Sequence, residues 1–144
     1  VAGDLRLIVA ILRVVNDLER AGDLAHNIAK LAQLEDYREP ALKEVRALLA
    51  ELGRETSRLL GLSIDAWANK DERLAADIAV QDDRLDDLHK ELIAKLVELK
   101  GEDALPPAIR LAMVGRYFER IGDHAVNLGE MVRYFVTGDE EHLG

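Results

Sequence analysis

Apolar residues recur at three- and four-residue steps along most of the chain, a spacing typical of amphipathic helices. We expect four helices, at about residues 4–36, 40–69, 71–99 and 106–136. Asp4 and Asp71 are predicted N-caps, because a carboxylate accepts from the free amides of a first turn. Gly101 and Gly138 are expected to follow the ends of the third and fourth helices.

The fold class predicted from this pattern is all-α. Long helices joined by short connections pack antiparallel, so we expect an up-down bundle. The chain has 144 residues, enough for one domain with a core of useful size. Only 4% of the residues are aromatic, so that core must be built from Leu, Ile, Val and Ala.

The apolar stripes predict which faces are buried. The first helix has a stripe of residues that we expect to pack against a neighbour: Ile8, Ile11, Val15, Leu18, Gly22, Ala25 and Ala29. The third helix has a stripe of the same kind: Leu74, Ile78, Leu85, Leu92 and Leu96.

Charge and composition exclude several function classes. The net charge of −9 argues against binding to a phosphate backbone and favours cationic partners or metal ions. There are no cysteines, so disulfides, zinc fingers and thiol chemistry are excluded. The longest apolar run, residues 7–15, is too short to cross a bilayer. No P-loop, dinucleotide fingerprint or Ser/His/Asp grouping is present.

One segment of the chain occurs twice. Residues 19–27 return as residues 119–127, with the same amino acid at Glu19/Glu119, Arg20/Arg120, Gly22/Gly122, Asp23/Asp123, Ala25/Ala125 and Asn27/Asn127. Repetition at a long period indicates two copies of one structural unit. The repeated positions are mostly polar, and carboxylates four residues apart share one side of a helix. The repeat therefore predicts two related sites.

The third helix carries an acidic run that divides between two faces. On a helical wheel, Asp82 lies on the shoulder of the apolar stripe with His89, and Asp86 lies just beside them. Asp83 and Asp87 fall on the opposite side, where we expect solvent. The run is thus predicted to present an inward and an outward pair of carboxylates.

Carboxylates gathered at a helix interface repel one another unless a proton, a basic partner or a cation compensates. Our hypothesis is a metal site of the Fe, Zn, Mn or Mg class between the third and fourth helices, formed by Asp82, Asp86, Glu119 and Asp123. Glu19 and Asp23 would form half of a second site. The alternative is surface ion pairing, in which Arg20 and Arg120 neutralise carboxylates of neighbouring helices.

A carboxylate-bridged metalloenzyme or a metal-storage bundle is the second functional alternative. Asp86 and His89 resemble one half of a di-iron motif. His26, His124 and His142 are expected at the edge or the surface of the bundle.

The repeated segments resemble the signature helices of the PhoU family of phosphate-uptake regulators. Residues 16–29 (NDLERAGDLAHNIA) and 116–129 (RYFERIGDHAVNLG) are similar to the two signatures. Residues 69–71 with 82–86 resemble the preceding helix of the second repeat, and residues 1–12 resemble the lead-in to the last helix of the first. The resemblance covers nearly the whole chain.

The resemblance implies tandem three-helix bundles. Residues 1–37 would be the last helix of a first repeat without its first two helices, residues 40–137 a complete second repeat, and residues 138–144 a disordered tail. With those helices missing, we expect the first helix to pack against another chain or to fold onto the second repeat as a fourth helix.

The resemblance also implies a function. The family acts as a cytoplasmic, non-enzymatic negative regulator of phosphate-starvation signalling, through contacts with a sensor histidine kinase and the phosphate ABC transporter ATPase. Some members bind iron or zinc clusters through E/D-x-x-x-D motifs, which map here to Asp82/Asp86, Glu119/Asp123 and Glu19/Asp23. We also expect a homodimer.

Overall fold

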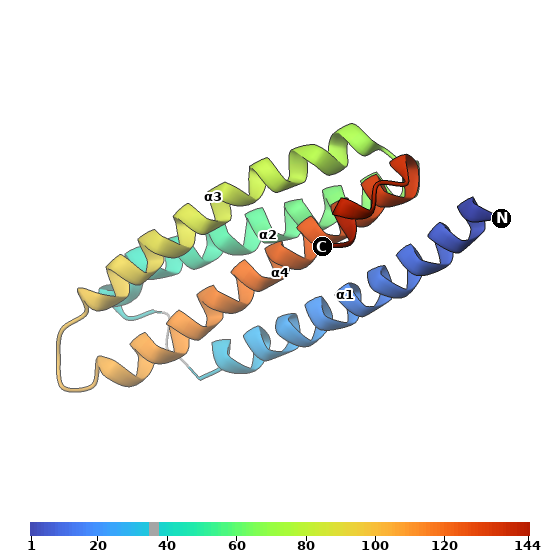
Figure 1. The fold of residues 1–144 in the computed structure, drawn as a ribbon. Helices are drawn as coiled ribbons and strands as arrows, with labels where there is room; N and C mark the ends of the chain where they lie inside the picture. The colour runs from blue at the N-terminus through green and yellow to red at the C-terminus, as the bar shows by residue number, and fades with distance from the viewer. Residues whose placement is uncertain (35–37) are drawn as a thin grey trace.

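The computed structural model describes residues 1–34 and 38–144, and within them the chain is helical with no strand. Four long helices run alongside one another (Figure 1). Their bounds are α1 Ala2–Ala32, α2 Lys43–Asn69, α3 Glu72–Val97 and α4 Leu105–Thr137. Two short 3-10 helices, η1 Pro40–Leu42 and η2 Glu140–Leu143, precede α2 and follow α4. The all-α prediction is confirmed.

Helices α2, α3 and α4 form a three-helix bundle around an aliphatic core. Leu52, Leu59, Leu85 and Leu92 are among its fully buried side chains. The core includes most of the stripe predicted for the third helix; only Leu74 is merely half-buried. Burial of large aliphatic side chains stabilises a fold by about 1.5–3 kcal/mol each, so this core is a major source of the stability of the fold.

Most of the predicted helix boundaries are close to those observed. Asp71 is the N-cap of α3, and its Oδ1 accepts from the backbone amide of Leu74 at 3.0 Å. Gly138 ends α4 in the left-handed conformation, with φ 75°. The prediction for Asp4 was wrong, because α1 begins at Ala2 and Asp4 lies in its first turn. In the first turn, the negative charge of Asp4 still interacts favourably with the positive end of the helix dipole.

The first helix also ends earlier than predicted, at Ala32, and residues 33–34 form a turn. The rest of the predicted first helix, residues 35 and 36, lies outside the described residues.

Helix α1 folds onto α4 as a fourth helix, antiparallel to it, and among the described residues α4 is the helix whose backbone it approaches closely. This was one of the two outcomes expected for the first helix. The buried residues of α1 are Ala10, Val14, Asp17 and Ala21. Small side chains let the two helices approach closely, and Asp17 is paired across the interface with His124.

The stripe predicted for the first helix was therefore wrong in position. Ile8 is 55% exposed and Val15 is 57% exposed, whereas the buried stripe lies beside them on the helix surface. The physical reason is that the polar pairing of Asp17 and the small side chains of Ala10 and Ala21 set the rotation of α1. Large apolar side chains remain exposed on the outer face of α1: Leu5, Ile8, Ile11, Leu12, Val15 and Leu18.

The C-terminal segment, for which a disordered tail is predicted over residues 138–144, includes the short helix η2 and contacts the bundle. His142 Nδ1 lies 2.6 Å from Glu130 Oε2 on α4. Arg13 of α1 donates to the backbone carbonyl of Leu143 at 2.6 Å, and the Leu143 side chain packs on the apolar cluster shared by α1 and α4. The segment thus contacts both helices. Within the described residues, no helix is long and apolar enough to cross a membrane.

Candidate functional site

Three glycines seven residues apart bring α3 close to α4: Gly115, Gly122 and Gly129. A Cβ built on Gly122 would lie 2.6 Å from Leu85 Cδ1 and 2.7 Å from Asp82 Oδ1, both far inside van der Waals contact. A Cβ on Gly129 would lie 3.0 Å from the backbone oxygen of Ala75. We call this row of glycines the glycine seam. The seam holds the Asp82 carboxylate directly against the backbone of α4.

The carboxylates predicted for the site lie close enough to affect one another's ionisation. The pKa of Asp82 is raised from 3.8 to about 6, first by burial and then by the charges of Asp86 and Asp123. The pKa of Asp123 is also raised, first by burial and then by Glu119. Asp83 and Asp87 are exposed, as predicted for the outward pair. The α3–α4 interface therefore gathers four acidic side chains, which we call the carboxylate cluster: Asp82, Asp86, Glu119 and Asp123.

Two side chains contact the Glu119 carboxylate, and the sequence analysis assigned neither of them this role. His89 Nδ1 lies 2.6 Å from Glu119 Oε2, and the Arg116 guanidinium pairs with Oε1. The predicted alternative named Arg120, one turn further along α4. The spacing of Arg116 and Glu119, three residues apart on a helix, is the signal that favours the observed pair.

Two buried polar atoms beside these pairs have no hydrogen-bond partner: Asp82 Oδ1 and His89 Nε2. Buried polar atoms without partners are uncommon, because each loses its hydration without compensation. Within the described residues, however, no three His, Asp or Glu side chains are arranged to hold a metal ion. The structure thus gathers acidic oxygens without placing them in coordination geometry.

The first copy of the repeat has a different environment. Glu19 and Asp23 are exposed on α1, and a Cβ on Gly22 would meet nothing within 4 Å. Gly122, its counterpart, is packed tightly against α3. The two copies are alike in sequence, but only the second faces an acidic helix among the described residues.

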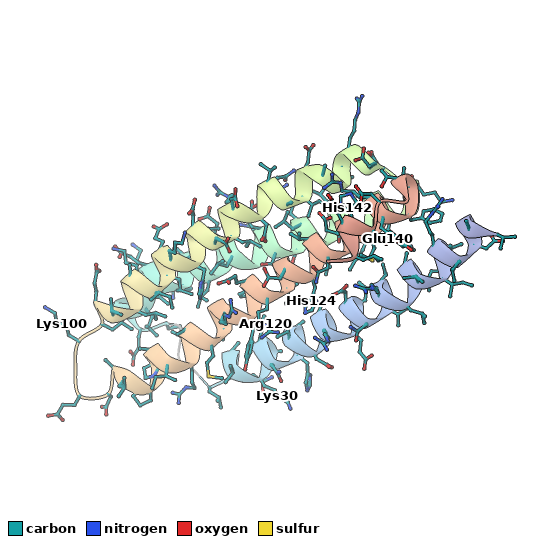
Figure 2. The ribbon with its side chains drawn as sticks, in the orientation of Figure 1. Lys30, Lys100, Arg120, His124, Glu140 and His142 are labelled. Atoms are coloured by element: carbon teal, nitrogen blue, oxygen red, sulfur yellow. The ribbon has the colours of Figure 1, made fainter. Side chains whose placement is uncertain are left out.

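A second polar group joins α1 to α4, and the sequence analysis missed it. Asp17 Oδ1 lies 2.7 Å from His124 Nδ1 and accepts from Asn127 Nδ2 at 3.2 Å. His124 is only 7% exposed, so the prediction that it lies at the edge or surface was wrong (Figure 2). The signal was available, because Asp17 continues the three- and four-residue spacing of Ala10 and Val14. Because Asp17 is polar, the sequence pattern alone indicates a solvent-exposed face at this stripe.

Comparisons with known proteins agree with this architecture. The family model described as "PhoU domain" matches residues 1–32 and 49–132. The chain is 35% identical over 138 residues to "Phosphate-specific transport system accessory protein PhoU homolog 1" of Mycobacterium tuberculosis, covering 96% of this chain and 62% of that protein. It is 39% identical over 150 residues to the PhoU homolog of Deinococcus radiodurans, covering 98% of this chain and 66% of the relative.

The fold has a close counterpart among solved structures. The crystal structure of PhoU from Pseudomonas aeruginosa matches with a TM-score of 0.84 at 37% sequence identity, over 96% of this chain and 67% of that one. The chain thus spans about two thirds of the length of these relatives. Together with the helical bundle and the doubled signature, these matches show that the chain belongs to the PhoU family.

Proposed function

We propose that this chain is a cytoplasmic, non-enzymatic adaptor that regulates phosphate uptake and represses phosphate-starvation signalling. The observation that carries the proposal is the similarity, over almost the whole chain, to proteins named as accessory to a phosphate-specific transport system. The partners expected from the family are the phosphate ABC transporter ATPase and a sensor histidine kinase. An adaptor requires an exposed binding face rather than a catalytic pocket.

The end of the bundle where α3 meets α4 offers such a face. Val97 is 78% exposed there, and Leu105 and Ile109 are exposed beside it. These side chains line an open apolar groove of about 450 Å³. Exposed apolar patches on otherwise polar proteins commonly mark binding sites for other proteins. We assign this surface, the tip surface, to the transporter ATPase or the kinase.

The tip surface can be tested by removing its apolar side chains. We expect the double variant Val97→Ser/Ile109→Ser to bind the transporter ATPase or the cytoplasmic part of the kinase about ten-fold more weakly, because two apolar contacts are lost. Biolayer interferometry with the immobilised chain measures this. Val80→Ser, at an exposed valine of α3 away from the tip, is the matched control. Unchanged affinity in the double variant would exclude the tip surface, and no binding by the native chain to either protein would contradict the adaptor function.

The exposed face of α1 supports the expected homodimer. Leu5, Ile8, Leu12 and Val15 follow one another at three- and four-residue steps and are all exposed. This is the spacing of a helix–helix seam. We propose that a second copy of the chain covers this face.

Sedimentation equilibrium tests the homodimer. We expect the native chain to associate reversibly and Ile8→Glu to be monomeric, because a charge in an apolar seam would lose its hydration on association. Val80→Glu introduces the same charge at an exposed valine outside the seam and should leave association unchanged. A native chain that stays monomeric at high concentration would refute the proposal.

We further propose that the carboxylate cluster binds a divalent metal ion. The unpartnered Asp82 Oδ1 supports the proposal, as do the raised pKa values of Asp82 and Asp123, which result first from burial and then from the neighbouring carboxylates. Oxygen ligands suit hard and borderline cations. Glu119 could join only by leaving His89 or Arg116, so binding requires side-chain rearrangement. The bound ion would neutralise the cluster.

Calorimetric titration with Mn²⁺ or Zn²⁺ tests metal binding. The variant Asp82→Asn/Asp123→Asn should lose affinity by about ten-fold or more, because two anionic ligands are removed. Asp83→Asn/Asp87→Asn removes the same charge from the exposed side of α3 and should bind like the native chain. Equal affinity of the two double variants would show that any bound ion lies elsewhere. If the native chain does not bind either ion, the metal proposal fails.

Without metal, the cluster should make stability depend on pH. The folded pKa of Asp82, about 6, lies above its ordinary value of 3.8, so the folded chain takes up this proton at higher pH than the unfolded chain. The contribution of Asp82 to the free energy of unfolding should therefore become more favourable as pH falls from about 7 towards 4.

Asp82→Asn should raise the free energy of unfolding at pH 7 by about 1 kcal/mol, less than the full pKa shift implies because the side chain is partly solvated. This gain should disappear near pH 4, where native Asp82 is itself neutral in the folded chain. Urea unfolding in a metal chelator at several pH values measures both effects, with Asp83→Asn as the control. Destabilisation by Asp82→Asn at pH 7 would contradict the account.

A further inference from the structure

A polar cleft lies between α1, α4 and the C-terminal segment. It is open to solvent and has a volume of about 600 Å³. Figure 2 shows His124 on α4 where it faces α1, and His142 further towards the C-terminal end of the chain. The polar side chains that line the cleft are Arg13, Asn16, Asp17, Arg20, His124, Asn127, Glu130, Glu141 and His142. It is separate from the carboxylate cluster, none of whose four members lines it.

At the base of the cleft, the orientation of one imidazole ring is fixed. Asp17 and His124 are both more than nine-tenths buried, and Asp17 Oδ1 lies 2.7 Å from His124 Nδ1. Asn127 donates to the same carboxylate oxygen at 3.2 Å, which holds Asp17 in place. When Nδ1 donates its proton to Asp17, a neutral ring has its lone pair on Nε2. His124 is thus prepared to accept a hydrogen bond from a ligand.

The α1 wall of the cleft provides donors. No ion pair or hydrogen bond within the described residues involves the side chains of Arg20 or Asn16, although both line the cleft. Arg13 uses one guanidinium nitrogen for the carbonyl of Leu143 at 2.6 Å, and its other N–H groups are not engaged by that bond. A guanidinium suits an oxyanion because its N–H groups match two oxygens at once.

The cleft therefore combines cationic donors with acceptors. A fully deprotonated anion such as sulfate would use the arginines but would meet His124 Nε2 and the carboxylates of Glu130 and Glu141 without a proton to offer. A hydrogen-phosphate group carries charged oxygens and an O–H on the same phosphorus. Its charged oxygens suit the arginine and asparagine donors, and its O–H suits His124 or a carboxylate.

We propose that this cleft binds a hydrogen-phosphate group, with Arg20, Asn16 and Arg13 as donors and His124 Nε2 as the acceptor. The group could belong to free inorganic phosphate or to a phosphomonoester, because both offer the same oxygens. This proposal names a ligand for a phosphate-uptake regulator, and it therefore rests on the proposed function. Binding of the ligand is measured directly, so its failure is distinct from a failure to bind a protein partner.

Titration of the isotope-labelled chain with inorganic phosphate, followed by two-dimensional NMR, tests the proposal. We expect saturable shifts confined to the residues that line the cleft, and no saturable shift with sulfate at equal ionic strength. Phosphoserine as a third titrant separates the two sources: tighter binding than inorganic phosphate assigns the cleft to a phosphomonoester, and weaker binding assigns it to the free ion.

Arg20→Gln provides the residue-level test, because Arg20 is exposed and its side chain takes part in no ion pair or hydrogen bond within the described residues. We expect it to weaken phosphate binding about ten-fold through loss of a charge-assisted hydrogen bond. Arg54→Gln, at an exposed arginine of α2 outside the cleft, should leave binding unchanged. Equal shifts with sulfate, equal effects of the two variants, or no saturable shift at the cleft would each overturn the proposal.

Discussion

The close approach of α3 to α4 along the glycine seam is the constraint on which the rest of the structure depends. Gly115 and Gly122 leave no room for a Cβ, so Leu92 and Leu85 of α3 pack directly on the backbone of α4, and Gly129 lies close to the backbone of Ala75. The same approach presses Asp82 into a partly apolar environment, where burial raises its pKa. The packing that builds the core therefore also creates the charge imbalance of the carboxylate cluster.

The two copies of the sequence repeat lie in different structural environments. Around Gly122 it forms part of a helix interface, with Glu119 held by His89 and Arg116. Around Gly22 it lies on an exposed surface of α1. Helix α1 is attached instead through an apolar cluster shared with α4 and the buried pairing of Asp17 with His124, and this pairing has no counterpart in the repeated positions. Sequence identity between the copies thus identifies a common unit, and the neighbouring helix decides what each copy does.

Much of the fold could be predicted because its signals are local. The cap at Asp71 and the stop at Gly138 depend on residues within one turn, and the stripe of α3 depends on the large aliphatic side chains that fill the core. The rotation of α1 could not be predicted in the same way. It depends on the partner found by Asp17 across 107 positions of sequence, and such pairing has no periodic signature. The hydrophobic pattern therefore favours the stripe of large apolar residues on α1 over the buried stripe, which is smaller and partly polar.

The candidate site shows the same division. The helical wheel predicted correctly which carboxylates of α3 face α4 and which face solvent, because that assignment needs only helical geometry. The pairing of Glu119 with His89 depends on the register between two helices, which the glycine seam determines. The wheel also gave no reason for His124 to be buried, since its burial follows from the docking of α1.

The most direct test of this account compares the same substitution at the two equivalent glycines. Gly122→Ala should lower the free energy of unfolding by about 1–3 kcal/mol, because the added methyl group collides with Leu85 and Asp82. Gly22→Ala should raise it by about 0.5–1 kcal/mol, because alanine favours helix and meets no neighbour there. Urea unfolding of both variants gives these values. Equal effects at the two positions, or stabilisation by Gly122→Ala, would contradict the claim that close approach at the seam organises the molecule.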